Sequence, residues 1–284
     1  MWHQMLVALK CFVKRRIAPR GIVVEAPTNG YLIVPILGQS NAFGMGVGLD
    51  LGKEDCPHPD VHQWAMCGPS KGSAVLAVDP LLHEIPGKGV GFGVTFGRSL
   101  AVETGRRILL MPCARGDTSF TPKNGYTWDP VDIRTRHNLY RDAVSAIDAA
   151  LDRFPGSCVA AILWHQGETD VPLTPGPVYR EKLDSVIHDM RARYGKDVPF
   201  IMGQMVPEEM ESGHAAYPVI DAVHADSPNR HDRVFFALGP HSAINGGFVK
   251  GRLDTHYNAA GQRELGRRMW AGYKSLCTDA PGEV

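Results

Sequence analysis

The sequence has little cysteine, no excess of charge of either sign and no long hydrophobic run. Six cysteines in 284 residues are too few for a disulfide scaffold. Thirty basic and thirty acidic residues cancel, and this balance argues against nucleic acid as a partner. The apolar stretches fall short of the ~20 residues that a transmembrane helix needs, so no stable membrane insertion is expected. The composition does not indicate an oligomeric state.

The N-terminal segment, MWHQMLVALKCFVKRR, has only a superficial likeness to a signal peptide. Its basic residues follow the apolar stretch, and no small-residue cleavage site comes after them. We therefore expect a cytoplasmic protein with an N-terminal extension over residues 1–28. An amphipathic helix here would present one apolar face, which leaves both peripheral membrane contact and docking on the body of the protein open. That face would comprise Met5, Leu6, Leu9, Phe12 and Val13.

The composition that is present, 44% apolar and 21% charged residues, is that of a globular protein. From residue 31 onward, short apolar runs alternate with longer stretches of helical period, which predicts a parallel sheet with crossover helices. We expect one domain over 29–278, a three-layer α/β/α sandwich with a central, mostly parallel five-stranded sheet, and a tail at 279–284. The expected strands are 31–37, 107–111, 158–164, 199–205 and 234–238, and the expected helices are 94–103, 136–154, 178–194, 215–225 and 259–276.

Two long segments, 44–91 and 116–132, do not fit this alternation. The first is rich in Gly, Pro and His, and connections of this length in a compact domain usually build a binding rim or a lid. Both segments follow predicted strands. We therefore expect both to overhang the carboxyl edge of the sheet, where open α/β folds bind ligands.

The run VPILGQSNAFG places a serine directly after a predicted buried strand. Gly38 permits a tight turn, and this turn would expose Ser40 at the sheet edge. A helix that starts after Ser40 would direct free N–H groups at a nearby negative charge. By itself the segment leaves two interpretations open, a nucleophilic serine or a serine that caps a helix.

Asp254 and His256 stand just before the last predicted helix, in the run LDTHYNAAGQ. A hydroxyl nucleophile needs a general base, and histidine is the side chain whose ordinary pKa lies closest to neutrality. An acceptor must hold the tautomer of that base, and Asp254 is two residues away. The alternative is a loop histidine beside an aspartate that caps the helix.

Polar residues also follow two further predicted strands. In ILWHQGETD the polar residues include Gln166, which can offer an amide N–H to an oxyanion, and Glu168, which can brace a neighbour by accepting hydrogen bonds. In MPCARGDTS, Gly116 can bring its backbone N–H close to a ligand because it has no side chain. A nucleophile, a base with its orienting acid and oxyanion donors are thus predicted at one edge of one sheet.

The motifs GQSN, PCA-x-G-x-TS, WHQGE and D-x-H before a terminal helix resemble the conserved blocks of the SGNH hydrolase superfamily. They are most similar to its branch of sialate O-acetylesterases and acetylxylan esterases, which has Gln in the third block, here Gln166, where other SGNH enzymes have Asn. The resemblance runs from about Ile33 to about Met269. It implies a flavodoxin-like fold and a carbohydrate O-acetylesterase that hydrolyses acetyl esters on sugars through a serine acyl-enzyme, without metal or cofactor.

The same resemblance implies the role of each residue. Ser40 attacks the ester carbonyl, His256 takes and returns the proton, and Asp254 orients His256. The oxyanion is held by the backbone N–H groups of Ser40 and Gly116 and by the side chain of Gln166. Supporting positions are Gln39, Asn41 and Glu168, the last bracing either His256 or its own loop.

The chain departs from this pattern at Asp117, where the family usually has a second Gly before Thr-Ser. The departure adds a charge near the expected oxyanion site. Trp128 and Tyr126, with Trp64, lie in the two long segments, where aromatic faces either stack on a sugar ring or pack the loops against the body. We expect Trp128, Tyr126 and Asp117 to contact the substrate, an O-acetylated carbohydrate.

Two other functions stay open at this point. One is a sugar O-acyltransferase of the same fold, which passes the acyl group to a second hydroxyl instead of water. The other is a carbohydrate-binding protein with weak turnover.

Overall fold

The computed structural model describes residues 21–212, 215–246, 248–249 and 252–278. The predicted helix at the N-terminus and the tail at 279–284 lie outside this range. Residues 21–28 of the expected extension are described, and part of them runs along the sheet, because Val24 N donates to Ala74 O and Leu76 N donates to Ile22 O.

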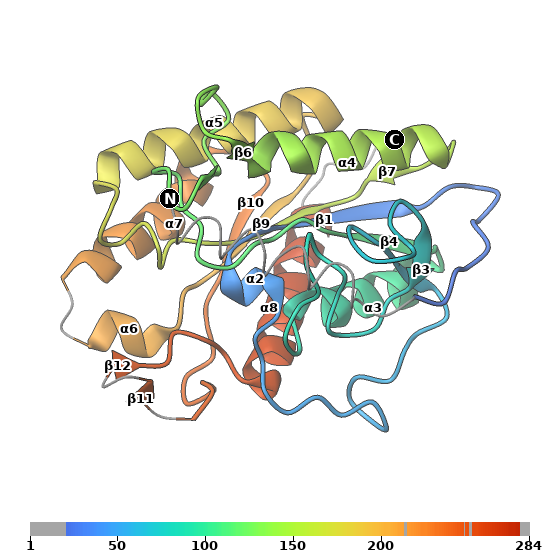
Figure 1. The fold of residues 1–284 in the computed structure, drawn as a ribbon, viewed down its shortest axis with the longest axis horizontal. Helices are drawn as coiled ribbons and strands as arrows, with labels where there is room; N and C mark the ends of the chain where they lie inside the picture. The colour runs from blue at the N-terminus through green and yellow to red at the C-terminus, as the bar shows by residue number, and fades with distance from the viewer. Residues whose placement is uncertain (1–20, 213–214, 247, 250–251, 279–284) are drawn as a thin grey trace.

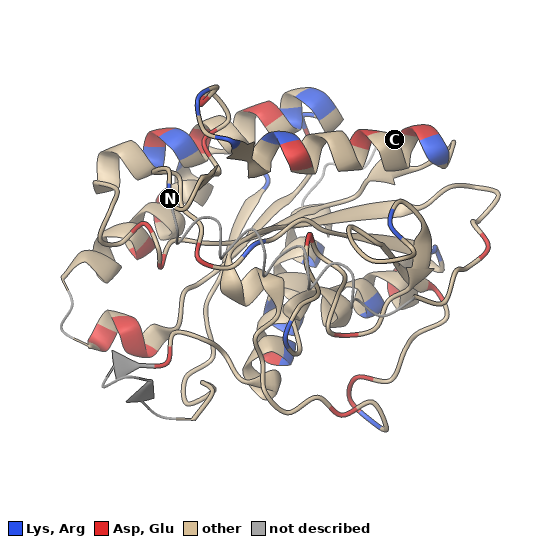
Figure 2. Ribbon diagram, viewed as in Figure 1, with Lys and Arg blue, Asp and Glu red and all other residues tan. Residues whose placement is uncertain are grey.

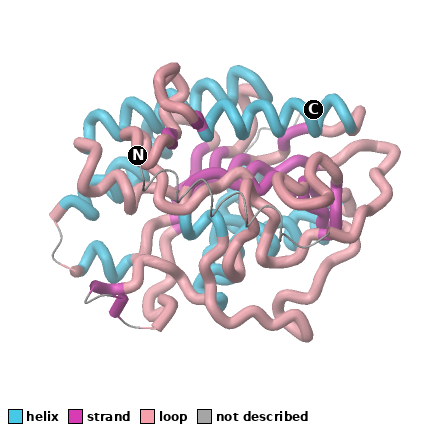
Figure 3. Tube along the Cα trace, in the orientation of Figure 1, coloured by secondary structure: helices cyan, strands magenta, loops and turns pink. Residues whose placement is uncertain are grey.

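A single twisted sheet forms the centre of the molecule, with helices on both of its faces (Figure 1; Figure 3). The five predicted strands are present and run parallel to one another. They are β1 (Leu32–Gly38), β4 (Ile108–Pro112), β8 (Ile162–His165), β9 (Phe200–Gly203) and β10 (Val234–Ala237).

The sheet has eight strands, so the expectation of five was too low. Its order is β10-β9-β8-β1-β4-β2-β3, with β7 (Cys158–Val159) also paired to β1. β2 (Val61–Trp64) pairs parallel with β4, and β3 (Ala74–Leu76) pairs antiparallel with β2. Both strands lie within the segment that we expected to be a loop. The two central residues of β2, His62 and Gln63, are polar, so a search for hydrophobic patterns does not detect this strand.

The five predicted helices are all present, with ends that differ by a few residues. α3 (Phe92–Thr104) and α8 (Ala259–Thr278) pack together on one face of the sheet, and α4 (Leu139–Arg153), α5 (Gly176–Tyr194) and α7 (Ala216–Arg230) cover the other. The start of α4 has a local cause, because the Asn138 side chain accepts a hydrogen bond from Arg141 N.

Short elements connect these layers. α2 (Ser40–Phe43) follows β1 directly, and α6 (Pro207–Glu211) follows β9. β5 (Tyr126–Thr127) pairs with β6 (His137–Asn138), and β11 (Phe248–Val249) pairs with β12 (Arg252–Leu253).

Alternate residues of the strands supply two hydrophobic cores, one on each face of the sheet. In β8, Ile162 and Trp164 join the core under α4 and α5, whereas Leu163 joins the core under α3 and α8. This period of two is what a strand buried on both faces requires. The Lys, Arg, Asp and Glu residues lie mainly on the helices and loops that surround the sheet (Figure 2).

No helix in the described part of the chain is long and apolar enough to cross a membrane.

Candidate active site

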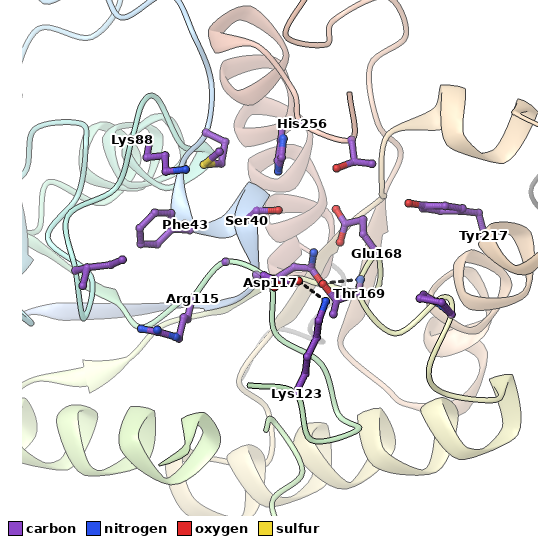
Figure 4. A pocket seen from close by; sticks show the side chains of 16 residues that line it. Ser40, Phe43, Lys88, Arg115, Asp117, Lys123, Glu168, Thr169, Tyr217 and His256 are labelled. Carbon is purple, nitrogen blue, oxygen red and sulfur yellow. Dashed lines mark hydrogen bonds and ion pairs between the residues drawn. The ribbon is translucent and has the colours of Figure 1, made fainter. Parts of the chain in front are cut away.

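The polar residues that follow β1, β4 and β8 meet the loop before α8 at one cavity of about 540 Å³. Among the predicted site residues, this cavity brings together Ser40, Gly116 and His256, with Glu168 and Asp117. Figure 4 shows the His256 ring above the Ser40 hydroxyl. The remaining lining residues are Gln39, Phe43, Met45, Ile85, Lys88, Arg115, Lys123, Thr169, Pro172, Tyr217 and Thr255.

A backbone turn that only glycine can make places Ser40 at the end of β1. Gly38 has a φ of 123°, and a Cβ at this residue would lie 1.9 Å from the backbone oxygen of His165. Any other residue at 38 would therefore force β1 and β8 apart. Ser40 is the first residue of α2 and is 8% exposed. The residue that caps α2 is Gln39, so Ser40 is not the helix cap of the alternative interpretation.

His256 is held by Asp254 through two hydrogen bonds. The Asp254 Oδ1 atom lies 2.7 Å from His256 Nδ1 and accepts from His256 N at 3.1 Å. This geometry fixes the ring and puts a proton on Nδ1, which leaves Nε2 as the basic nitrogen. Among the described residues, Ser40 and His256 form no direct hydrogen bond with each other. Catalytic hydrogen bonds are often long in structures without substrate and shorten when substrate binds.

Asn41 ties the serine turn to the histidine loop. Its amide nitrogen donates to Glu168 Oε1 and to Thr255 O, each at 2.9 Å, and its amide oxygen accepts from Tyr257 N at 3.1 Å. Asn41 is fully buried. The supporting position predicted for it therefore has a structural basis, since one side chain joins segments more than 200 residues apart in sequence.

Two backbone N–H groups lie beside Ser40 and are free to bind an oxyanion. A Cβ built on Gly116 would lie 3.8 Å from Ser40 Cβ, so the two residues are neighbours. Within the described part of the chain, neither Ser40 N nor Gly116 N donates a hydrogen bond. Ser40 N is free because it lies in the first turn of a helix.

The structure does not place Gln166 at this cavity, which corrects the predicted oxyanion contact. Gln166 is fully buried and is not among the lining residues. Its amide nitrogen has two N–H groups and lies within hydrogen-bonding distance of three acceptors, an Asp170 carboxylate oxygen, Thr118 O at 3.2 Å and Gln39 Oε1 at 3.3 Å. These three acceptors already exceed the two N–H groups of the amide, so Gln166 has no N–H left to donate to an oxyanion in the cavity.

Glu168 lines the cavity and braces the site through Asn41 rather than through His256. Its Oε1 accepts from Asn41 and lies 3.7 Å from His165 Nδ1, while its Oε2 has no partner in the described structure. Burial lowers the pKa of His165, and His165 Nε2 donates to Gln204 O at 2.8 Å. A neutral His165 leaves the carboxylate as the negative end of the cavity.

The aromatic residues predicted to contact substrate do not reach the cavity. Trp128 is fully buried, donates from Nε1 to Thr118 Oγ1 at 3.0 Å and packs edge-on against Trp164. Tyr126 stacks on His137 and lies under the Arg115 guanidinium, 3.8 Å from its ring centroid. Trp64 packs against Phe154. These rings hold the loops to the body, which was the alternative interpretation.

Asp117 does line the cavity, and its contact with the substrate stays a prediction. Its φ of 59° is a left-handed backbone conformation, which explains why a glycine is usual at this position. Its carboxylate forms an ion pair with Lys123 and accepts from Asn124 Nδ2. The added charge is therefore compensated locally (Figure 4).

Sequence reasoning missed several cavity residues that belong to no motif. Phe43, Met45 and Ile85 are apolar residues of the lining. Figure 4 shows Lys88 on the same side as Phe43 and Tyr217 on the opposite side. The expectation that residues 44–91 overhang the sheet edge was the one available signal. The described residues hold no cluster of three His, Cys, Asp or Glu that could bind a metal.

A parallel sheet with Ser, Gly and an Asp–His pair at its carboxyl edge defines an SGNH-type hydrolase fold. A family model described as a carbohydrate esterase, sialic acid-specific acetylesterase, matches residues 31–275. The chain belongs to this family.

Known relatives agree with this assignment. The chain is 27% identical over 175 residues to a probable 9-O-acetyl-N-acetylneuraminic acid deacetylase of Escherichia coli K12, a match that covers 50% of this chain and 54% of that protein. The chain thus spans about half the length of this relative.

Solved structures share the fold. The crystal structure of NanS has a TM-score of 0.74 at 19% identity, with 90% of this chain and 100% of that chain covered. A protein from Arabidopsis thaliana has a TM-score of 0.66 at 21% identity, with 87% and 98% covered. A carbohydrate acetylesterase from Xanthomonas citri has a TM-score of 0.59 at 16% identity, with 87% and 56% covered.

Proposed function

We propose that this protein removes an acetyl group from an O-acetylated sialic acid through a serine acyl-enzyme. The observation that carries the proposal is that His256, held by Asp254, lines the same cavity as Ser40 and Gly116, whose backbone N–H groups donate no hydrogen bond in the described structure. The family and the name of the Escherichia coli relative support the choice of acyl group and sugar.

In the first half of the reaction, His256 Nε2 takes the proton of Ser40 Oγ while Oγ forms a bond to the acetyl carbon. The carbonyl oxygen becomes an oxyanion, which the N–H groups of Ser40 and Gly116 stabilise. The bond from the acetyl carbon to the sugar oxygen then breaks, and His256 returns its proton to that oxygen. In the second half, water attacks the acetyl-serine by the same route and acetate leaves.

The unpaired charges at opposite sides of the cavity would orient an acidic sugar. Asp117 neutralises Lys123, and Glu84 pairs with Arg115. The exposed Lys88 ammonium, in contrast, has no ion-pair or hydrogen-bond partner among the described residues. Figure 4 shows Lys88 on the side of Ser40 opposite Glu168. A sugar carboxylate is attracted to the Lys88 side of the cavity and repelled from the Glu168 side.

A substrate panel tests this function. We expect release of acetate from 9-O-acetylated sialic acid with a higher kcat/KM than from an acetylated neutral sugar, with an aryl acetate as reference. Equal rates on the acidic and the neutral sugar would remove the proposed preference and leave a general carbohydrate acetylesterase.

Two further measurements separate the alternative functions. With an added sugar acceptor, an acyltransferase would form an acetylated acceptor in place of free acetate. A fluorophosphonate probe labels an activated serine, so a protein that only binds carbohydrate would stay unlabelled at Ser40.

We expect Lys88→Met to lower kcat/KM on 9-O-acetylated sialic acid roughly 5- to 10-fold, the effect of losing one solvent-exposed charge-assisted hydrogen bond. Activity on its methyl ester and on an aryl acetate should not change. The wild-type preference should shrink in high salt, which screens an exposed charge. Lys53→Met, an exposed lysine outside the cavity, is the matched control. An equal loss on acid and methyl ester would mean that Lys88 does not bind the carboxylate.

A further inference from the structure

Gln39 has an amide whose orientation is fixed by its surroundings. The residue is 3% exposed and lines the cavity directly before Ser40. Its Oε1 accepts from the backbone N–H of Thr169 at 3.1 Å and lies 3.3 Å from Gln166 Nε2. A backbone N–H can only donate, so the atom that faces Thr169 must be the amide oxygen.

The other end of the same amide is therefore a nitrogen with two N–H donors. Gln39 Nε2 has no acceptor among the described residues, and it is not one of the side-chain nitrogens that are closed off from solvent. Gln39 is buried on its other sides and lines the cavity. We therefore expect its Nε2 donors to point into the cavity.

The Gln166 amide behind Gln39 also has a fixed orientation. Its nitrogen donates to the carboxylate of Asp170, which can only accept if ionised, and its oxygen accepts from the Tyr179 hydroxyl at 2.8 Å. Gln166 thus presents its nitrogen toward Gln39 Oε1, which lies 3.3 Å away.

We infer that Gln39 Nε2 is the side-chain donor to the oxyanion, beside the N–H groups of Ser40 and Gly116. Gln166 is a positioning residue that holds Gln39 from behind. This inference rests on the proposed esterase function. The reaction then has three donors around the developing charge, none of which must move when the charge forms.

The isosteric variant Gln39→Glu provides the sharpest test. Its carboxylate keeps an acceptor for Thr169 N and for Gln166, so the local fold is retained, but the donor to the oxyanion is lost. We expect kcat on an aryl acetate to fall roughly 10²- to 10³-fold, the range for loss of one such donor, with KM nearly unchanged. Labelling of Ser40 by a fluorophosphonate, measured by mass spectrometry, should slow comparably, because its tetrahedral phosphorus occupies the same site.

Two further variants show whether Gln166 acts through Gln39. Gln166→Met should lower kcat with little change in KM. The double variant Gln39→Glu with Gln166→Met should lose no more than Gln39→Glu alone, because a positioning residue has nothing left to position. Asn29→Asp, an exposed amide before β1 and therefore at the other end of the strand, is the matched control.

The outcomes are distinguishable. Wild-type hydrolysis with an unchanged kcat in Gln39→Glu would overturn the role of Gln39 and leave the esterase function in place. A rise in KM with an unchanged kcat would make Gln39 a substrate-binding residue and also overturn the inference. Failure of the wild-type protein both to hydrolyse any acetyl ester and to react with the probe would overturn both proposals. Thermal denaturation of each variant shows that the fold is retained.

Discussion

Ser40→Ala is expected to abolish ester hydrolysis, with a loss of kcat on the order of 10⁶-fold, while the protein stays folded. The loss is this large because the acyl-enzyme cannot form without the hydroxyl. The stability of the fold should change by less than ~1 kcal/mol, since Ser40 is not the residue that caps α2 and its hydroxyl makes no hydrogen bond in the described structure.

Initial rates on an aryl acetate, thermal denaturation and fluorophosphonate labelling check this expectation together. Ser99→Ala is the matched control, because Ser99 lies on α3 outside the cavity and its hydroxyl donates to Thr95 O of its own helix. Retained turnover in Ser40→Ala, or labelling at another serine, would show that the nucleophile lies elsewhere.

His256→Ala is the second change with a large expected effect, a loss of kcat on the order of 10⁴- to 10⁶-fold. Without the imidazole nothing removes the proton of Ser40 Oγ or returns one to the departing sugar oxygen. Substrate binding should change little, because the ring faces the serine and its side chain is 25% exposed.

His188→Ala, an exposed histidine on α5, serves as the control. The comparison should use single-turnover as well as steady-state rates, so that a slow acylation step is separated from slow release of acetate. A His256→Ala enzyme within tenfold of wild type would exclude His256 as the general base and remove the basis for the role of Asp254.

Much of the fold could be read from the sequence. The five predicted strands are longer or more apolar than β2, β3 and β7, and their hydrophobic pattern is detectable without knowledge of their neighbours. β3 was missed because it has only three residues. β2 was missed because its centre is polar, and His62 finds its partners, the Tyr31 hydroxyl and Pro59 O, only after folding. Such tertiary partners make a polar strand stable where its own composition would not.

The candidate site was predictable to the extent that topology determined it. The carboxyl ends of parallel strands lie at the same edge of a sheet, so the residues that follow β1, β4 and β8 lie close together although they are far apart in sequence. Side-chain direction was not predictable in this way. Gln39 and Gln166 have the same amide, and partners far away in sequence decide which of the two reaches the cavity.

The sequence by itself determined the α/β class, the positions of the principal strands along the chain and the segments that meet at the site, because each depends on local pattern and on the direction of parallel strands. Only the tertiary structure decided that Trp128 packs in the core, that Lys88 stands unpaired in the described structure and that Gln166 lies behind Gln39. The physical reason is that hydrogen bonds and burial depend on neighbours from other segments, and no local pattern records which neighbours those will be.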